Sequence, residues 1–238
     1  MKKLGIYGDS FADYQMGHDD YPELDEFSWM HLLQSDYDVT CHGLRGSSIY
    51  YSYSKFLESH ADYDKIIFVV TTYDRWPLAI NFANRKMCFP SLVSVEYAIK
   101  NLNFFNVSAE DKQVQTKLRA LHMYFKYLVH DLDKVNHTFA DLMIAEIKRI
   151  RPDTIFVTFD TMWGYTEKFQ ENLVGVPQNL EYIAEKYYEI RCICHVSEEM
   201  NQIIYQDAKQ ALLSGTWVST VPDIVEHKHP FSYYYRKT

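Results

Sequence analysis

A serine that directly follows a short apolar run is the first residue of this chain that could do chemistry. Leu4–Tyr7 is typical of a β-strand, and Gly8, Asp9 and Ser10 follow it as a tight turn that leads toward a helical pattern. Ser10 is therefore expected at the carboxyl end of a strand. The amides of a helix start would there stabilise the negative charge that develops in acyl transfer. Serine and aspartate also cap helices, so the triplet alone fits either a nucleophile or a cap.

A group of cysteines and histidines near the C-terminus is the second candidate for chemistry, as a soft metal site. Its members are Cys192, Cys194, His195, His227 and His229. The Cys-x-Cys spacing lacks the usual hairpin spacing of zinc ligands, and the last two ligands would come from a tail, so we predict no metal. The chain has no Walker A loop, no G-x-G-x-x-G and no G-x-S-x-G, which leaves P-loop NTPases, Rossmann dehydrogenases and ordinary α/β-hydrolases without support.

Strand-like and helical segments alternate along the chain. Beyond the first strand, we expect strands at 37–41, 64–71 and 154–159, with 190–194 as a candidate last strand. Helices are expected at about 26–35, 49–59, 110–131, 134–150, 179–189 and 197–213. The pattern predicts an α/β protein with a parallel sheet covered on both faces and its active edge at the strand carboxyl ends. We predict one domain over 1–238, with a helical and aromatic insertion at about 76–131, which could form a lid or an interface, and a tail at 214–238.

Composition and charge narrow the classes of function. The chain has 238 residues, 47% of them hydrophobic, and a formal net charge of -8, which argues against nucleic-acid or anionic-membrane partners. No apolar run approaches the ~20 residues of a membrane span, and we see no leader-like segment. The four cysteines are irregularly spaced, which favours free thiols in a reducing compartment, so we predict a cytoplasmic protein. Tyr233–Tyr235 fit equally a homo-oligomer or partner contact and a tail packed on its own chain.

At Gly8, Asp9 and Ser10 the chain resembles the SGNH hydrolases, the GDSL esterase/lipase superfamily, and the resemblance extends over residues 4–75 and 150–213. It implies a flavodoxin-like, three-layer α/β/α fold in which four short blocks converge on one site. Ser10 stands where the family keeps its nucleophile, and no cofactor is implied. The second block is a glycine whose N–H stabilises the oxyanion. Gly43 and Gly46 both qualify, and we favour Gly46 because it opens a helix, as the family's segment does.

The third block departs from the family's Gly-x-Asn-Asp. The matching segment is Thr71–Asp74, in which Asp74 is kept but Thr71 replaces the glycine and Tyr73 replaces the asparagine that donates to the oxyanion. A phenol donates one hydrogen bond with a different reach. Tyr73, Arg75 or a backbone amide would have to substitute, or activity is weak. We group Asp9, Gly46, Tyr73 and Asp74 as oxyanion and substrate-binding candidates.

The fourth block, Asp-x-x-His before the last helix, has two candidates. His195 directly precedes the closing helix but has Cys192 at the acid position, whereas His229 has Glu226 three residues before it and lies in the tail. We favour His195 as general base because its place in the fold matches the family. The orienting group stays open among Glu189, Asp223, Glu226, a backbone carbonyl and water.

The resemblance and these residues predict hydrolysis of a carboxylic ester, with a short acyl or O-acetyl group on a small molecule or carbohydrate. The replaced asparagine and aspartate favour the alternative, a catalytically impaired member of the fold that acts as a binding or assembly module.

Overall fold

The structure is a computed structural model, and it describes part of the chain. The described residues are 1–13, 28–44, 46–71, 79–82, 85–88, 92–100, 112–129, 133–158, 174–175, 192–193 and 196–220.

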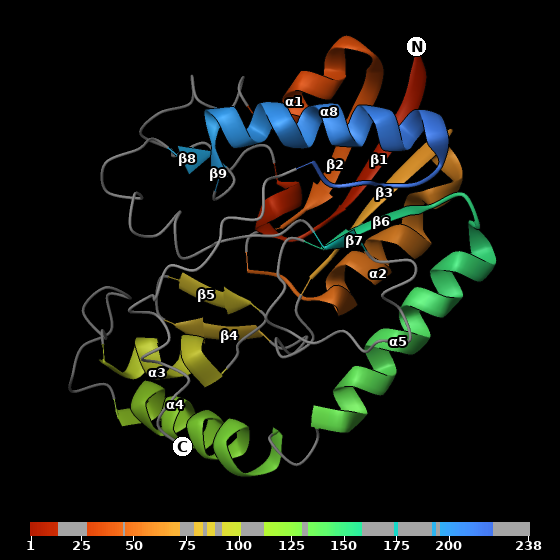
Figure 1. The fold of residues 1–238 in the computed structure, drawn as a ribbon. Helices are drawn as coiled ribbons and strands as arrows, with labels where there is room; N and C mark the ends of the chain where they lie inside the picture. The colour runs from red at the N-terminus through yellow and green to blue at the C-terminus, as the bar shows by residue number, and fades with distance from the viewer. Residues whose placement is uncertain are drawn as a thin grey trace.

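A five-stranded, all-parallel sheet forms the centre of the fold (Figure 1). Its strands are β1 (Lys2–Gly8), β2 (Tyr37–Gly43), β3 (Lys65–Val70), β6 (Ile155–Thr158) and β7 (Val174–Gly175). The strand order is β2-β1-β3-β6-β7. With the five strands counted along the chain, this is the flavodoxin-like order 2-1-3-4-5. The predicted fold class is thereby confirmed.

Helices cover both faces of the sheet, which gives three layers. Figure 1 shows α1 (Trp29–Leu32) and α8 (Glu198–Ser214) on one side, and α2 (Ile49–Ser59) and α5 (Asp133–Ile150) on the other. The core divides in the same way, because alternate residues of a strand point to opposite faces. On β3, Ile67 and Val69 pack with α1 and α8, whereas Ile66, Phe68 and Val70 pack with α2 and α5. A strand buried on both faces needs the continuous apolar run that predicted it.

Two buried polar residues of α8 fasten that helix to its neighbours. The Asn201 side-chain oxygen accepts a hydrogen bond from the Trp29 amide at 2.9 Å, which ties α8 to the start of α1. The Asp207 carboxylate accepts from the amide and the hydroxyl of Thr220 at 2.8 and 2.7 Å. These bonds fix the helix and the segment after it. The helix ends at Gly215, whose positive φ of 82° and amide bond to the Ala211 carbonyl form a glycine C-cap.

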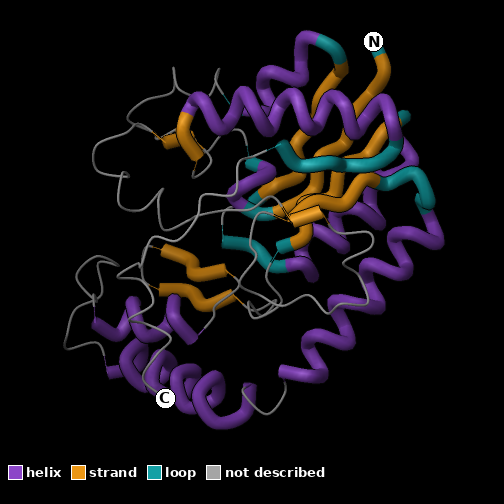
Figure 2. Tube along the Cα trace, viewed as in Figure 1, coloured by secondary structure: helices purple, strands orange, loops and turns teal. Residues whose placement is uncertain are grey.

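A second group of elements follows β3. It contains the hairpin β4 (Ala79–Phe82) and β5 (Arg85–Cys88), then α3 (Leu92–Lys100) and α4 (Lys112–Tyr124), which continues as a π-helix over Phe125–Val129. In Figure 2 the hairpin and these helices lie at the lower left. The long helix expected at 110–131 is confirmed. The weak periodicity of 76–109 is explained by a short hairpin followed by a short helix.

The prediction for the last strand was wrong. β8 (Cys192–Ile193) does not join the main sheet but pairs antiparallel with β9 (Val196–Ser197), and the fifth strand of the sheet is β7. Both segments have two residues, too short for an alternating pattern to distinguish them. The helix expected at 179–189 lies outside the described residues. In the part of the chain that the structure describes, no helix is both long and apolar enough to cross a membrane.

Candidate functional site

The carboxyl ends of three neighbouring strands bring the segments of three predicted site residues, Asp9, Ser10 and Gly46, to one edge of the sheet. β1 lies between β2 and β3, and their registers place Gly8 beside Gly43 and Tyr7 beside Phe68. The segments that follow these strands therefore meet at one edge of the sheet. The chain runs from β1 to β2 on one side of this point and from β3 to β6 on the other. In doubly wound sheets, ligands bind where the connections diverge in this way.

Ser10 is the second residue after β1 and is nearly buried, with 7% of its surface exposed. It opens η1 (Ser10–Ala12), a 3-10 turn of three residues, so the helix start that we expected is a single short turn. Asp9 caps this turn, because its Oδ1 accepts from the Phe11 amide at 3.1 Å. The capping role that the sequence left open for Gly8, Asp9 and Ser10 therefore belongs to Asp9 and not to Ser10.

Two glycines allow β1 and β2 to approach this turn. A Cβ on Gly8 would lie 2.7 Å from the Cβ atoms of both Ala12 and Val69. A Cβ on Gly43 would lie 2.3 Å from the Ala12 carbonyl carbon and oxygen, which are backbone atoms. No real Cβ approaches so closely, so both positions require glycine. Gly43 is accordingly packed against the turn that contains Ser10.

Gly46 has a different environment. Its φ is 67°, in the left-handed region that favours glycine, and a Cβ built on it would meet no atom of the described residues within 4 Å. Of the two glycines proposed from the sequence as oxyanion donors, Gly43 is thus packed against backbone, whereas a Cβ on Gly46 has no close neighbour in the described part of the chain.

Buried hydroxyl groups link the three segments. The Thr71 Oγ1 donates to Asp9 Oδ2 at 3.1 Å and also lies 3.4 Å from the Ser47 carbonyl oxygen. The Ser47 Oγ donates to the Gly8 carbonyl oxygen at 3.3 Å. Sequence reasoning gave these hydroxyls no role. The signal that could have found them is the position of Thr71 and Ser47 just beyond two strands that flank the strand of Ser10.

The structure thus places Asp9, Ser10 and Gly46 together. Tyr73, Asp74 and His195, as well as the competing His229, lie outside the described residues. Among the residues that are described, no group of three or more histidine, cysteine or acidic side chains could hold a metal ion.

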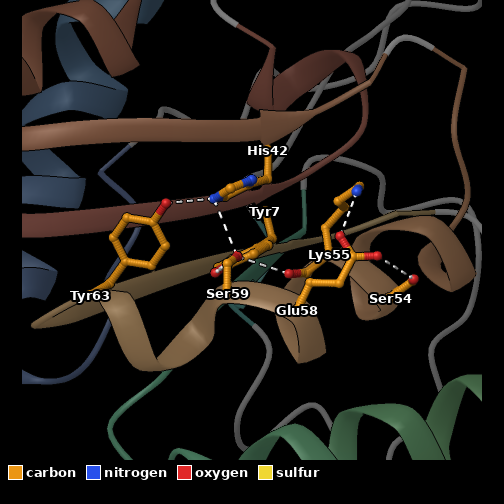
Figure 3. A network of polar contacts seen from close by, with 7 residues as sticks. All are labelled: Tyr7, His42, Ser54, Lys55, Glu58, Ser59 and Tyr63. Carbon is orange, nitrogen blue, oxygen red and sulfur yellow. Dashed lines mark hydrogen bonds and ion pairs between the residues drawn. The ribbon is translucent and has the colours of Figure 1, made fainter.

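A second polar cluster lies over β1, β2 and the end of α2 (Figure 3). The Tyr7 ring stacks on His42 with centroids 4.7 Å apart, and the Tyr7 hydroxyl is 2.9 Å from Ser59 Oγ. His42 Nε2 is 2.7 Å from the Tyr63 hydroxyl and 3.5 Å from Ser59 Oγ. Burial raises the pKa of Tyr7 to about 12 and lowers that of His42. Because Ser59 donates its proton to the Lys55 carbonyl at 2.9 Å, we assign this cluster a structural role.

Comparison with known proteins gave one informative description. No family model matches the chain, and none of the curated proteins matches it. Among solved structures, it is similar to a candidate lipolytic protein of the G-D-S-L family from Desulfitobacterium hafniense DCB-2, at 13% sequence identity and a TM-score of 0.34. The match covers 89% of this chain and 100% of that one.

Proposed function

We propose that the chain is a serine hydrolase of the SGNH type that cleaves a carboxylic ester with a short acyl group, such as an O-acetyl group on a small molecule or carbohydrate. The observation that carries this proposal is the position of Ser10. It lies just beyond β1, at the edge where β2, β1 and β3 end, and Ser47, the residue after Gly46, donates its hydroxyl to the Gly8 carbonyl oxygen there. A flavodoxin-like sheet binds its ligands at this place.

In the proposed reaction, Ser10 Oγ attacks the ester carbonyl and loses its proton to His195. The tetrahedral intermediate then collapses, and the alcohol leaves with that proton. Water then attacks the acyl-enzyme in place of the alcohol; His195 takes a proton from the water and returns it to Ser10 Oγ as the bond to the acyl group breaks, and the carboxylic acid is released. The amides of Ser10 and Gly46 are proposed to donate to the oxyanion, and the packing of Gly43 against the Ala12 backbone supports the choice of Gly46 over Gly43.

The replaced third oxyanion donor sets an expectation for the rate. Losing one such donor costs on the order of 3–4 kcal/mol of transition-state stabilisation. Unless Tyr73 supplies a hydrogen bond in place of the asparagine, we therefore expect an esterase that is roughly 100- to 1,000-fold slower than one with a complete set.

A fluorophosphonate probe tests the proposal, because it labels an activated serine and ignores an ordinary one. We expect labelling that mass spectrometry assigns to Ser10 and that Ser10→Ala abolishes. Ser59→Ala is the matched control, since Ser59 also lies near a histidine but donates to a carbonyl, and it should leave labelling unchanged. Comparing His195→Ala with His229→Ala identifies the base. Full labelling of His195→Ala would contradict its assignment.

A second function is favoured by one observation, the presence of Tyr73 and Cys192 where the resembled family has an oxyanion amide and an acid. A chain without a working site would serve as a binding or assembly module on the same fold. Folded protein that the probe does not label, and that hydrolyses no short-chain ester, would favour that function over the esterase.

A further inference from the structure

Thr71, at the end of β3, contacts the segments that follow both neighbouring strands. Its side chain is nearly buried, with 5% of the residue exposed. The hydroxyl carries one proton, which points to Asp9 Oδ2 at 3.1 Å, with the Ser47 carbonyl oxygen at 3.4 Å as the weaker acceptor. One side chain from β3 thus bridges the segment after β1 and the segment after β2.

From Thr71, hydrogen bonds lead to both proposed functional groups. Asp9 uses one carboxylate oxygen for Thr71 and the other for the Phe11 amide at 3.1 Å, and the bond to Phe11 spans Ser10. On the other side, Ser47 directly follows Gly46, and its hydroxyl donates to the Gly8 carbonyl oxygen at 3.3 Å. The contacts form a closed circuit around the start of the 3-10 turn.

We propose that Thr71, Asp9 and Ser47 are positioning residues that hold the Ser10 hydroxyl and the Gly46 amide in fixed relation. This inference rests on the proposed function. It also changes the role of Asp9, which the sequence placed among the oxyanion and substrate-binding candidates. An ionised carboxylate has no proton to donate to an oxyanion, and both Asp9 oxygens accept bonds from the protein itself.

The physical reason is the sensitivity of acyl transfer to distance. Nucleophile and oxyanion donor come from segments after different strands, and a displacement of about 1 Å can reduce a rate by roughly 100-fold. Hydrogen bonds in a low-dielectric interior hold their partners firmly, whereas exposed segments at the ends of two strands move independently. A hydroxyl on the third strand that bonds to one segment and contacts the other restrains both.

The test uses Thr71→Val, which removes the hydroxyl while keeping the branched shape, and Thr71→Ser, which keeps the hydroxyl. The matched control is Thr154→Val, because Thr154 precedes β6 at the opposite edge of the sheet, is 8% exposed, and its Oγ1 has no hydrogen-bond partner among the described residues. For each variant we would measure the rate constant of fluorophosphonate labelling per folded molecule and the amide hydrogen exchange of residues 9–12 and 46–48.

We expect Thr71→Val to label about 10- to 100-fold more slowly and to exchange faster in both segments, while Thr71→Ser and Thr154→Val behave like wild type. Wild-type labelling and exchange in Thr71→Val would overturn the inference and leave the hydrolase proposal standing. Wild-type protein that never labels would end the hydrolase proposal, and exchange would still decide whether Thr71 restrains the two segments. If Thr71→Val does not fold, Ser47→Ala breaks the circuit at its other side and is expected to show the same two effects.

Discussion

Replacing Gly43 by alanine should displace the turn that contains Ser10. The new Cβ would lie 2.3 Å from the carbonyl carbon and oxygen of Ala12, and 2.6 Å from the Asp13 amide nitrogen. Ordinary carbon contacts begin at 3.4 Å, so the two backbones must separate by about 1 Å. Both segments are backbone, and no side chain can rotate out of the way. Ala12 ends the turn that Ser10 opens, so the displacement reaches the proposed nucleophile.

Two magnitudes follow. Overpacking of this kind costs about 1–3 kcal/mol of the free energy of unfolding, which in a chain of this length lowers Tm by roughly 2–12 °C. A shift of about 1 Å between nucleophile and oxyanion donor should slow acylation by roughly 100-fold. Thermal unfolding followed by circular dichroism gives the first quantity. The labelling rate constant, corrected for the folded fraction, gives the second.

Gly5→Ala is the control. Its Cβ would lie 2.6 Å from the Tyr63 ring, so this variant is also strained, but at the middle of β1 and against a side chain. We expect a lowered Tm with labelling per folded molecule at the wild-type rate. The reasoning would be refuted if Gly43→Ala kept the wild-type Tm and labelling rate. Equal loss of labelling in both variants would mean that general destabilisation, and not displacement of the turn, causes the effect.

Three further predictions concern stability. Burial, followed by the charge of Lys55, lowers the pKa of His42 from 6.5, so the free energy of unfolding should fall as the pH drops below about 6.5. Urea midpoints at pH 7 and pH 5 measure this dependence, and it should be weaker in His42→Phe. Burial raises the pKa of Tyr7 from 10.0 to about 12, so the free energy of unfolding should fall as the pH rises from 10 toward 12. Guanidinium denaturation at those pH values should show a smaller fall for Tyr7→Phe. Asp207→Ala removes both hydrogen bonds to Thr220 and should lower the free energy of unfolding by about 3 kcal/mol in a denaturant titration. Thr220→Val removes only the hydroxyl bond and should cost less; equal costs would contradict a contribution from the amide bond.

The central strands and the covering helices could be predicted from the sequence because their burial requires long apolar patterns. β3 is apolar at nearly every position, since it is buried on both faces, and α8 has an apolar stripe of helical period facing the sheet. β7 escaped prediction because two residues carry no period. The hairpin β4–β5 escaped because its four-residue strands are no longer than many loops.

Part of the site could also be predicted, since a serine after the first strand of a parallel sheet must lie at the carboxyl edge. The sequence favours Gly46 over Gly43 because Gly46 opens a helix, and the packing of Gly43 against the Ala12 backbone supports the same choice independently. The contacts of Thr71 depend on which strands are neighbours and on their register, and no local pattern encodes either. In the sequence, Thr71 is only a departure from the family's glycine, and its hydrogen bond to Asp9 becomes visible only in the structure.

The parallel sheet also has a practical consequence for handling the protein. All five strands run in one direction, so Met1, which is 81% exposed, lies at the edge of the sheet opposite the one where Ser10 lies. A fusion partner or surface anchor attached there extends away from the proposed catalytic edge. Immobilised or tagged protein should therefore remain open to probes and substrates.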